Sequence, residues 1–295
     1  MGLLPMDIDI LPPSDDRVFR VLMTTEEAKP VLMKLIAGVI GRPVVDVTVH
    51  NNELAISDIQ EKMERFDVNC KTEDGSQINL EMQASRMEED RGSQHKNLKS
   101  RIIYFLCDLH SSQPSRGLCR YDKLARTYQV TFCSYTVFPH RENYMNSFSM
   151  RNDVDNELLH DAVQTVIIEL SKLDEILKKP VETMTDMEKF SVFFEYADNP
   201  KYRDTVNKVI DSEEVLKVAS NLLMNISKDE RERAIFRSRR KLQMDMESNM
   251  ATAVDNRVIE IVRNMLANCE PVEKIEKYTG LTGSDIESLR DTKEH

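Results

Sequence analysis

Two short runs of alternating apolar and polar residues, separated by a strong turn signal, constrain the fold of this chain most tightly. The runs cover residues 66–72 and 77–83, and the four residues between them contain an Asp-Gly pair. Alternation with a period of two is typical of strands with one buried face, and an Asp-Gly pair between two such runs predicts a β-hairpin. Each strand carries one acid, Asp67 on the first and Glu81 on the second.

The register of this hairpin decides whether the two acids can act together. A two-residue turn at Asp74-Gly75 pairs Asp67 with Met82, so the two carboxylates point to opposite faces of the hairpin. A three-residue loop that ends with Gly75 in the left-handed conformation of a bulge pairs Asp67 with Glu81 instead. The two β-carbons then lie about 5 Å apart on one face. The sequence is compatible with both registers.

Two carboxylates at that separation repel each other, so such a pair usually needs a cation between them. Hard divalent ions such as Mg²⁺ accept carboxylate oxygens as ligands, together with waters and substrate phosphates. The alternative is a hairpin whose polar face lies in solvent, where facing acids are merely tolerated. The spacing of the residues alone leaves both interpretations open.

Asp67 and Glu81-Met82-Gln83, with thirteen residues between them, resemble the split active-site motif of the PD-(D/E)XK nuclease superfamily, with glutamine in place of the motif lysine. Further segments resemble one branch of that superfamily, the PD-(D/E)XK nuclease family transposases, or Rpn group of recombination-promoting nucleases. These segments are Asp16–Arg20, Arg101–Tyr104, Gly117–Pro139, Leu170–Lys172 and Ile275–Leu281. They occur in the family's order and span most of the chain, although the usual proline is absent at Ala125-Arg126.

The resemblance implies an α/β fold with a restriction-endonuclease-like PD-(D/E)XK core, in which helices flank a mixed sheet, followed by an all-helical C-terminal region. We expect the nuclease-like domain over 14–178 and the helical region over 181–295, because strand signals end near Pro180. The sequence predicts helices over 16–38, with a break at Pro30, and over 87–112, and strands over 44–49, 128–137 and 163–170.

The helical region carries a basic segment and two short helices near its end. Residues 229–246 include six basic side chains, which predict either a solvated helix face or a contact with the DNA backbone. Further helices are predicted over 249–268 and, as a pair, over 271–289. This region could also mediate a homo-oligomer. Phe190, Phe193 and Phe194 are predicted to pack in a core.

The resemblance implies a Mg²⁺- or Mn²⁺-dependent DNA endonuclease that hydrolyses phosphodiester bonds and promotes recombination or transposition. Asp67 and Glu81 would hold the metal, with the backbone carbonyl of Met82 as a further ligand. Gln83 would orient the attacking water through its amide, but an amide can neither accept the proton nor carry positive charge. We therefore expect a slow enzyme.

Three more residues take supporting roles in this interpretation. Arg101 and Tyr104 share one stripe of the long predicted helix and would contact phosphate or support the acids. Asp16 would either bind a second metal ion or cap the first helix. The sequence has no glycine-rich phosphate loop, so we expect no nucleotide cofactor.

The net charge of −11 weighs against tight DNA binding, because proteins that hold DNA through phosphates alone are usually basic. It predicts weak, salt-sensitive binding and keeps two alternatives open: a catalytically weakened relative that binds DNA or protein, and a non-enzymatic, self-associating protein. Five scattered cysteines indicate a reducing compartment. With no apolar run of about 18 residues and no signal peptide evident, we expect a cytoplasmic protein that does not span a membrane.

Overall fold

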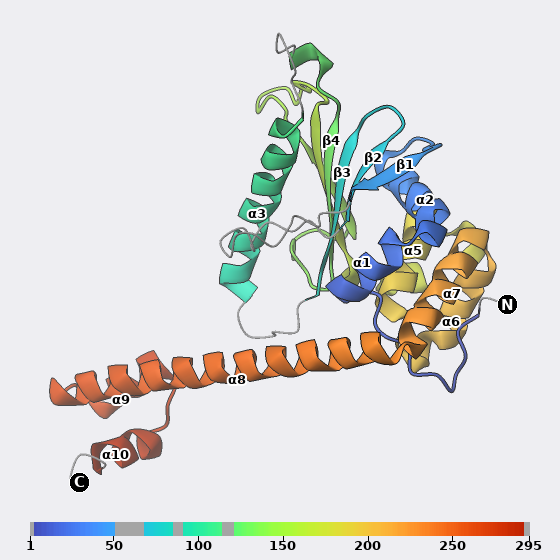
Figure 1. Cartoon of the computed structure of the whole chain (residues 1–295). Coiled ribbons are helices and arrows are strands. Elements are labelled where there is room, and N and C mark those ends of the chain that lie inside the picture. Colours follow the sequence, from blue (N-terminus) through green and yellow to red (C-terminus); the bar gives the residue numbers. More distant parts are fainter. Residues whose placement is uncertain (1–2, 51–67, 85–90, 114–120, 292–295) are drawn as a thin grey trace, which may run out of the picture. The chain divides into compact units, whose positions relative to one another are not determined.

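The computed structural model describes residues 3–50, 68–84, 91–113 and 121–291 (Figure 1). Asp67, Gly117 and the predicted start of the long helix at residue 87 lie outside these ranges. The chain divides into two compact units, residues 1–233 and 234–295. No helix among the described residues is long and apolar enough to cross a membrane.

The first unit contains a six-stranded mixed sheet with the strand order β1-β2-β3-β4-β6-β5. Strands β3, β4 and β6 run parallel to one another, while β1, β2 and β5 pair antiparallel to their neighbours. The strands are β1 (Val47–His50), β2 (Val68–Thr72), β3 (Gln77–Gln83), β4 (Thr127–Cys133), β5 (Met145–Ser149) and β6 (Val163–Glu169). Five of them lie close to predicted strands, and only β5 among the described strands had not been predicted.

The β2–β3 hairpin adopts the register with the three-residue loop. Val68 pairs with Leu80 and Lys71 with Gln77. Gly75 has a φ of +89°, the left-handed conformation that this loop requires. The Asp74 carboxylate fixes the loop by accepting hydrogen bonds from Thr72 Oγ1 at 2.6 Å and from the Ser76 backbone N–H at 3.1 Å.

Helices cover both faces of the sheet (Figure 1). On one face lie α1 (Asp16–Thr24), α2 (Lys29–Ile40) and α5 (Asp186–Tyr196), and on the other lies α3 (Arg91–Ser111). The core of the first face is aromatic, with ring centroids of Phe19, Phe132 and Phe194 within 5.8 Å of one another. The α3 face has a separate core: Leu98, Ile102, Cys133, Val137 and Ile167.

The first helical region breaks earlier than expected. Asp15 caps α1 by accepting hydrogen bonds from the backbone N–H groups of Arg17 and Val18. The chain then leaves the α-helix after Thr24 and passes through the short 3₁₀ helix η1 (Glu26–Ala28). Pro30 stands in the first turn of α2 instead of breaking a helix, because its missing N–H would have no partner there.

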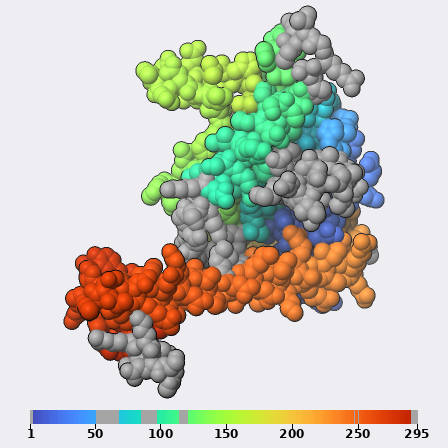
Figure 2. Space-filling model, turned by 60° about the vertical axis from the view of Figure 1, so that its left-hand side comes forward, coloured from blue at the N-terminus to red at the C-terminus, as the bar shows by residue number. Residues whose placement is uncertain are grey.

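The remaining helices of the first unit are α4 (Asp174–Leu177), α6 (Arg203–Asp211) and α7 (Glu214–Lys228), with short 3₁₀ helices η3 (Tyr121–Lys123), η4 (Leu170–Lys172), η5 (Val181–Thr183) and η6 (Pro200–Tyr202). Because α5 and α7 pack against α2, and α7 also packs against α1, all three helices α5–α7 belong to the sheet's unit. The division at 233 therefore falls further along the chain than the predicted one near 180. In Figure 2 the yellow-green segment around residues 150–160 projects from this unit.

The second unit is helical. Helix α8 (Glu230–Ala267) continues into it from the first unit, followed by α9 (Val272–Thr279) and α10 (Gly283–Asp291). Its small core contains Val262, Ile275 and Ile286. The predicted pair of short helices is confirmed, while the helix predicted over 249–268 is the second half of the longer α8.

Candidate active site

Glu81 lies on the central strand β3, and its side chain points to the α3 face. Alternation along the strand places Asn79, Glu81 and Gln83 on this face and Met82 on the opposite one. Glu81 pairs in register with Thr131 of β4 and is only 3 % exposed. A carboxylate buried at this depth needs a compensating charge or hydrogen bonds.

Arg101 supplies part of that compensation from α3. Its Nη2 atom lies 3.7 Å from Glu81 Oε2, which is within range of an ion pair but too long for a hydrogen bond. The Arg101 side chain is 40 % exposed, although its Nε atom is buried and has no hydrogen-bond partner among the described residues. Oε2 of Glu81 is buried and has no hydrogen-bond partner among the described residues.

The environment of Glu81 raises the pKa of its carboxyl group. Burial is the largest cause, because it disfavours the charged form. The positive charge of Arg101 and a hydrogen bond from the Asn79 side chain act in the opposite direction without cancelling it. The carboxylate therefore gains from any further cation that approaches its free oxygen.

A buried polar layer surrounds Glu81 on the α3 face. The Asn79 amide donates a hydrogen bond of 2.8 Å to Gln129 Oε1, and Gln129 Nε2 lies 3.4 Å from Thr131 Oγ1. All three side chains are fully buried, yet Asn79 Oδ1 has no hydrogen-bond partner in the described structure. These residues were not among those predicted for the site. The signal for them in the sequence is a set of amide and hydroxyl side chains inside strands that otherwise look apolar.

The donor atoms at this site fit a hard cation. Glu81 Oε2 and Asn79 Oδ1 are both oxygens, both buried and both without a hydrogen-bond partner. Oxygen ligands are those that Mg²⁺ and Mn²⁺ prefer. The described ranges contain no group of three His, Cys, Asp or Glu side chains that could hold a metal. The other predicted acid, Asp67, lies outside those ranges.

The other residues predicted for the active site lie at different distances from Glu81 in the fold. Gln83 ends β3, and its carbonyl accepts a hydrogen bond of 3.1 Å from the Ser134 N–H. The Met82 side chain is buried on the opposite face, so only its backbone adjoins Glu81. Tyr104 follows Arg101 on α3 and is 52 % exposed. Asp16 begins α1, which packs on the opposite face of the sheet and is capped by the preceding residue.

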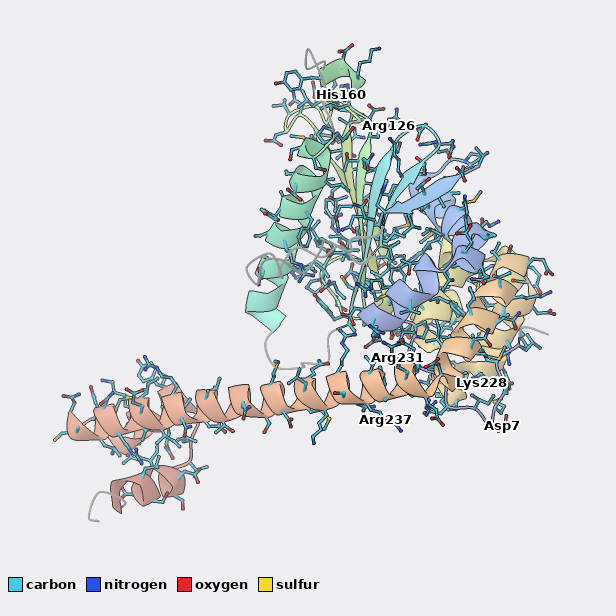
Figure 3. All side chains as sticks on the ribbon, viewed as in Figure 1. Asp7, Arg126, His160, Lys228, Arg231 and Arg237 are labelled. Carbon is cyan, nitrogen blue, oxygen red and sulfur yellow. The ribbon has the colours of Figure 1, made fainter. Side chains whose placement is uncertain are left out.

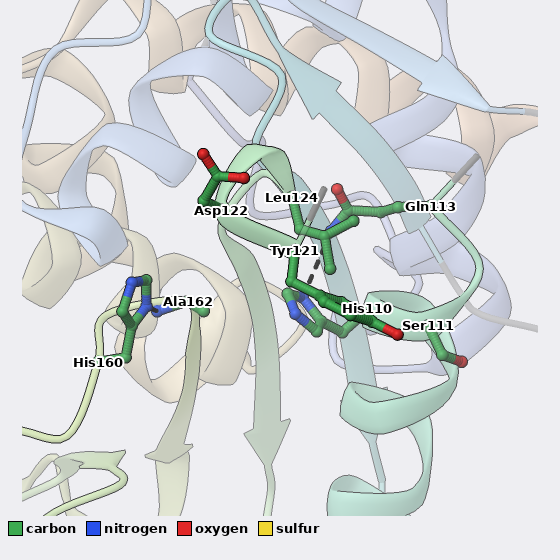
Figure 4. Close-up of a pocket in the computed structure, with 8 residues that line it drawn as sticks. All are labelled: His110, Ser111, Gln113, Tyr121, Asp122, Leu124, His160 and Ala162. Carbon is green, nitrogen blue, oxygen red and sulfur yellow. Dashed lines mark hydrogen bonds between the residues drawn. The ribbon is translucent and has the colours of Figure 1, made fainter. Parts of the chain in front are cut away.

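A cavity of about 610 Å³ lies at the other end of the parallel strands (Figure 4). There His110 Nδ1 lies 2.8 Å from Thr127 Oγ1, and burial lowers the pKa of the His110 imidazole. Thr127 begins β4, about 13 Å along the strand from the partner of Glu81. The cavity is therefore separate from the candidate active site. Its lining residues are His110, Ser111, Gln113, Tyr121, Asp122, Leu124, His160 and Ala162.

A mixed six-stranded sheet flanked by helices is consistent with the PD-(D/E)XK nuclease-like class of α/β proteins. The model of the PD-(D/E)XK nuclease family transposases matches residues 13–253. The chain therefore belongs to this family, and the predicted family and fold class are confirmed. No curated protein and no solved structure matches the chain.

Proposed function

We propose that this protein is a divalent-metal-dependent DNA endonuclease that hydrolyses phosphodiester bonds and promotes DNA recombination or transposition. Its catalytic part is the nuclease-like domain over 14–178. The observation that carries the proposal is the buried Glu81 carboxylate, whose Oε2 has no hydrogen-bond partner in the described structure although it lies on the family's motif strand. Family membership supports the same reaction class.

Asp67 and Glu81 are the proposed metal ligands, with the Met82 backbone carbonyl as a third. The hairpin register supports this assignment, because it is the register that would pair Asp67 with Glu81 if it continued for one more residue. When bound, Mg²⁺ or Mn²⁺ supplies Lewis acidity at the phosphate and acidifies the attacking water.

The side chains around Glu81 would position the substrate. Arg101 is close enough to the carboxylate to lower its pKa and exposed enough to contact a phosphate oxygen. Tyr104 lies one helical turn further along α3. Its hydroxyl would contact the same DNA strand as Arg101. Gln83 orients the water but cannot accept its proton, so proton transfer falls to solvent or to the substrate phosphate, and turnover is slow.

DNA is the proposed partner despite the net charge. The charged start of α8 exposes basic side chains, of which Arg231 and Arg237 are labelled in Figure 3. The others are Arg239, Arg240 and Lys241. Such a run provides the local positive charge that phosphate contacts need on an acidic chain. We place the protein in the cytoplasm, as a homo-oligomer through its helical region, where Leu242, Met246 and Val254 expose apolar surface.

A second candidate function is a catalytically weakened relative that binds DNA or protein. Glutamine at position 83, in place of the family's motif lysine, favours this alternative, and so does the acidic charge. The two candidates differ in one respect: the first cuts DNA and the second only retards it.

Nicking of supercoiled plasmid tests the proposal. The purified chain is incubated with Mg²⁺, Mn²⁺ or EDTA beside Glu81→Gln and a control, Glu182→Gln, which neutralises an exposed acid on η5. We expect metal-dependent nicking by the parent chain and by the control, and none by Glu81→Gln. Activity that survives Glu81→Gln would place the chemistry elsewhere. Absence of nicking with every metal would favour the binding-only relative.

A further inference from the structure

We infer that a cation–aromatic surface beside the Glu81 site binds unpaired nucleotides of a nucleic-acid strand. This surface, called the Phe138 platform below, comprises Phe138, Phe148, Lys99 and Arg141. The inference rests on the proposed function, because it names the kind of substrate that the same site would receive.

The platform is a pair of half-buried rings with two cations over them. The ring centroids of Phe138 and Phe148 lie 5.4 Å apart, with an interplanar angle of 36°. The Arg141 guanidinium carbon lies 5.5 Å from both centroids, and Lys99 Nζ lies 4.6 Å from the centroid of Phe138. Proteins that bind single-stranded nucleic acids combine aromatic rings, on which bases stack, with Arg and Lys side chains, which contact phosphates.

The two cations place positive charge at the surface of a chain with a net charge of −11. Both side chains are exposed, and within the described ranges neither forms an ion pair. Among the described residues, the only polar contact of the Arg141 side chain is a long hydrogen bond of 3.4 Å to the neutral Asn146. Most other cations of this unit have carboxylate partners, for example Arg17 with Glu232. The platform therefore keeps uncompensated positive charge available for a polyanion.

An ion pair between the buried Glu169 and the mostly buried Lys172 holds the platform in place. Glu169 is completely buried and accepts hydrogen bonds from the backbone N–H groups of Val137 at 2.6 Å and Phe138 at 2.9 Å. Lys172 Nζ lies 2.8 Å from Glu169 Oε2 and donates to the backbone carbonyls of Phe138 and Arg141, both at 2.7 Å. The loop that carries Phe138 and Arg141 is thus fixed before any ligand arrives, which lowers the entropic cost of binding.

The platform is continuous with the candidate active site. Phe138 and Phe148 pack against the core cluster that includes Leu98 and Ile102 of α3, the helix that also presents Arg101 to Glu81. The loop of Phe138 follows β4 directly, and its first residue, Ser134, donates a backbone hydrogen bond to the Gln83 carbonyl. A strand whose phosphate lies at Glu81 can therefore place its next nucleotides on the platform.

The chemistry favours unpaired nucleotides over an intact duplex. In a duplex the base faces are covered by their neighbours, so the rings of Phe138 and Phe148 would have nothing to stack on. Only Lys99 and Arg141 would then contribute to duplex binding, through contacts with its phosphates. Unpaired bases expose their faces and would use both parts of the platform.

Fluorescence anisotropy on the full chain tests the inference. The Glu81→Gln background prevents cleavage, EDTA removes metal, and the probes are a labelled 12-nucleotide oligothymidine and a labelled 20-base-pair duplex. The variants Phe138→Leu, Arg141→Gln and Lys99→Gln are compared with Lys123→Gln, which removes an exposed cation on η3, near the other end of the strands. Phe138→Tyr keeps the ring and serves as the conservative variant.

We expect Phe138→Leu to weaken oligothymidine binding about tenfold, as the loss of one stacked base predicts, with little effect on the duplex. Phe138→Tyr should bind like the parent. Arg141→Gln and Lys99→Gln should each weaken binding of both probes and reduce its salt dependence, because each removes a phosphate contact. Lys123→Gln should bind like the parent.

Three results would overturn the inference: unchanged oligothymidine binding by Arg141→Gln, equal losses on both probes in Phe138→Leu, or a loss in Lys123→Gln as large as that in Lys99→Gln. Arg141 is exposed, so its variant keeps the test decisive even if Phe138→Leu does not fold. The outcome is separable from that of the proposed function. Plasmid nicking with unchanged binding by the variants would reject the platform alone, while platform-dependent binding without nicking would reject the nuclease alone.

Discussion

The Arg101 guanidinium and the Glu81 carboxylate lie 3.7 Å apart, on a side chain that is 40 % exposed and on one that is buried, respectively. Their charges attract, but no hydrogen bond reaches Glu81 Oε2 from any described residue. Arg101 therefore reduces the cost of burying this acid without saturating its acceptor oxygen. This leaves a carboxylate with a raised pKa and an available ligand atom on the strand that carries the family motif.

Arg101→Gln should move metal binding to higher pH. The charge of Arg101 lowers the pKa of Glu81, so its loss lets the pKa rise further, and a metal ion then competes with a more tightly held proton. We expect the pH midpoint of the Mn²⁺-induced increase in Tm to shift upward. Thermal unfolding with and without Mn²⁺ between pH 5 and 9 measures it. Arg126→Gln, which breaks an exposed pair with Asp161, should leave the midpoint in place.

Gln83→Lys should accelerate nicking. A lysine at this position restores the family's motif residue and supplies a positive charge and a titratable proton, both of which the amide lacks. Positioned acid–base groups contribute on the order of 10²–10⁴ in rate, so an increase of at least about tenfold is expected. Single-turnover nicking rates of the variant and of Gln83→Met make the comparison. A lysine variant no faster than the methionine variant would show that position 83 does not act on the water.

Glu169 and Lys172 should be strongly coupled in stability. Removing Lys172 leaves Glu169 as a buried, incompletely paired charge, and removing Glu169 leaves the mostly buried Lys172 without its carboxylate; such losses cost up to about 3–5 kcal/mol. Glu169→Gln and Lys172→Met should each lower the free energy of unfolding by this order. The double variant should lose less than the two single losses together. Urea unfolding of the four proteins measures the coupling, and strictly additive losses would contradict it.

Glu195→Gln should stabilise the protein at high pH but not at low pH. Burial, reinforced by the charge of Asp198, raises the pKa of the Glu195 carboxyl to about 7, and its Oε2 atom has no described hydrogen-bond partner. The folded state therefore binds this proton more tightly than the unfolded state. The resulting stability is fully present below the unfolded pKa of about 4.5 and is lost as the pH rises through about 7.

Replacement by the neutral amide should remove that loss. Allowing for solvent screening of a partly exposed group, we expect Glu195→Gln to exceed the parent in unfolding free energy by about 1–2 kcal/mol at pH 8. The difference should vanish near pH 4.5. Urea unfolding at both pH values provides the measurement, with the exposed Glu182→Gln as control. An advantage of equal size at both pH values would point to packing and not to ionisation.

Gly75→Ala should weaken the β2–β3 hairpin through its backbone conformation alone. Gly75 has a φ of +89°, where a side chain is strained, while a β-carbon there would meet only ordinary contacts with Lys71 and Ala125. We expect a loss of about 1 kcal/mol in unfolding free energy, and a smaller loss for Gly75→Asn, because asparagine tolerates left-handed conformations better. Thermal unfolding of both variants tests the order. A cost for asparagine equal to that for alanine would contradict this explanation.

Local patterns predicted much of the fold. Alternation and the Asp-Gly turn predicted the β2–β3 hairpin, and the left-handed Gly75 selects one of the two registers that the sequence allowed. The apolar strands β4 and β6 and the paired helices α9 and α10 were also predicted close to their observed positions. Strand β5 was missed because it reads Met-Asn-Ser-Phe-Ser, a pattern with little β-branched content that gains its strand form from pairing with β6.

For the candidate site, too, some features follow from the sequence and others only from the tertiary structure. The sequence by itself determined that Glu81 follows a hairpin turn on a strand and shares a face with Gln83, because side chains alternate with a fixed period along any strand. Only the tertiary structure decided that Glu81 is buried, that Asn79 and Gln129 surround it, and that Arg101 approaches from α3. An amphipathic segment shows which of its faces is apolar but not what that face will cover. Burial, pKa and ion pairing depend on contacts between segments far apart in the chain, so they exist only once the sheet and its helices have packed together.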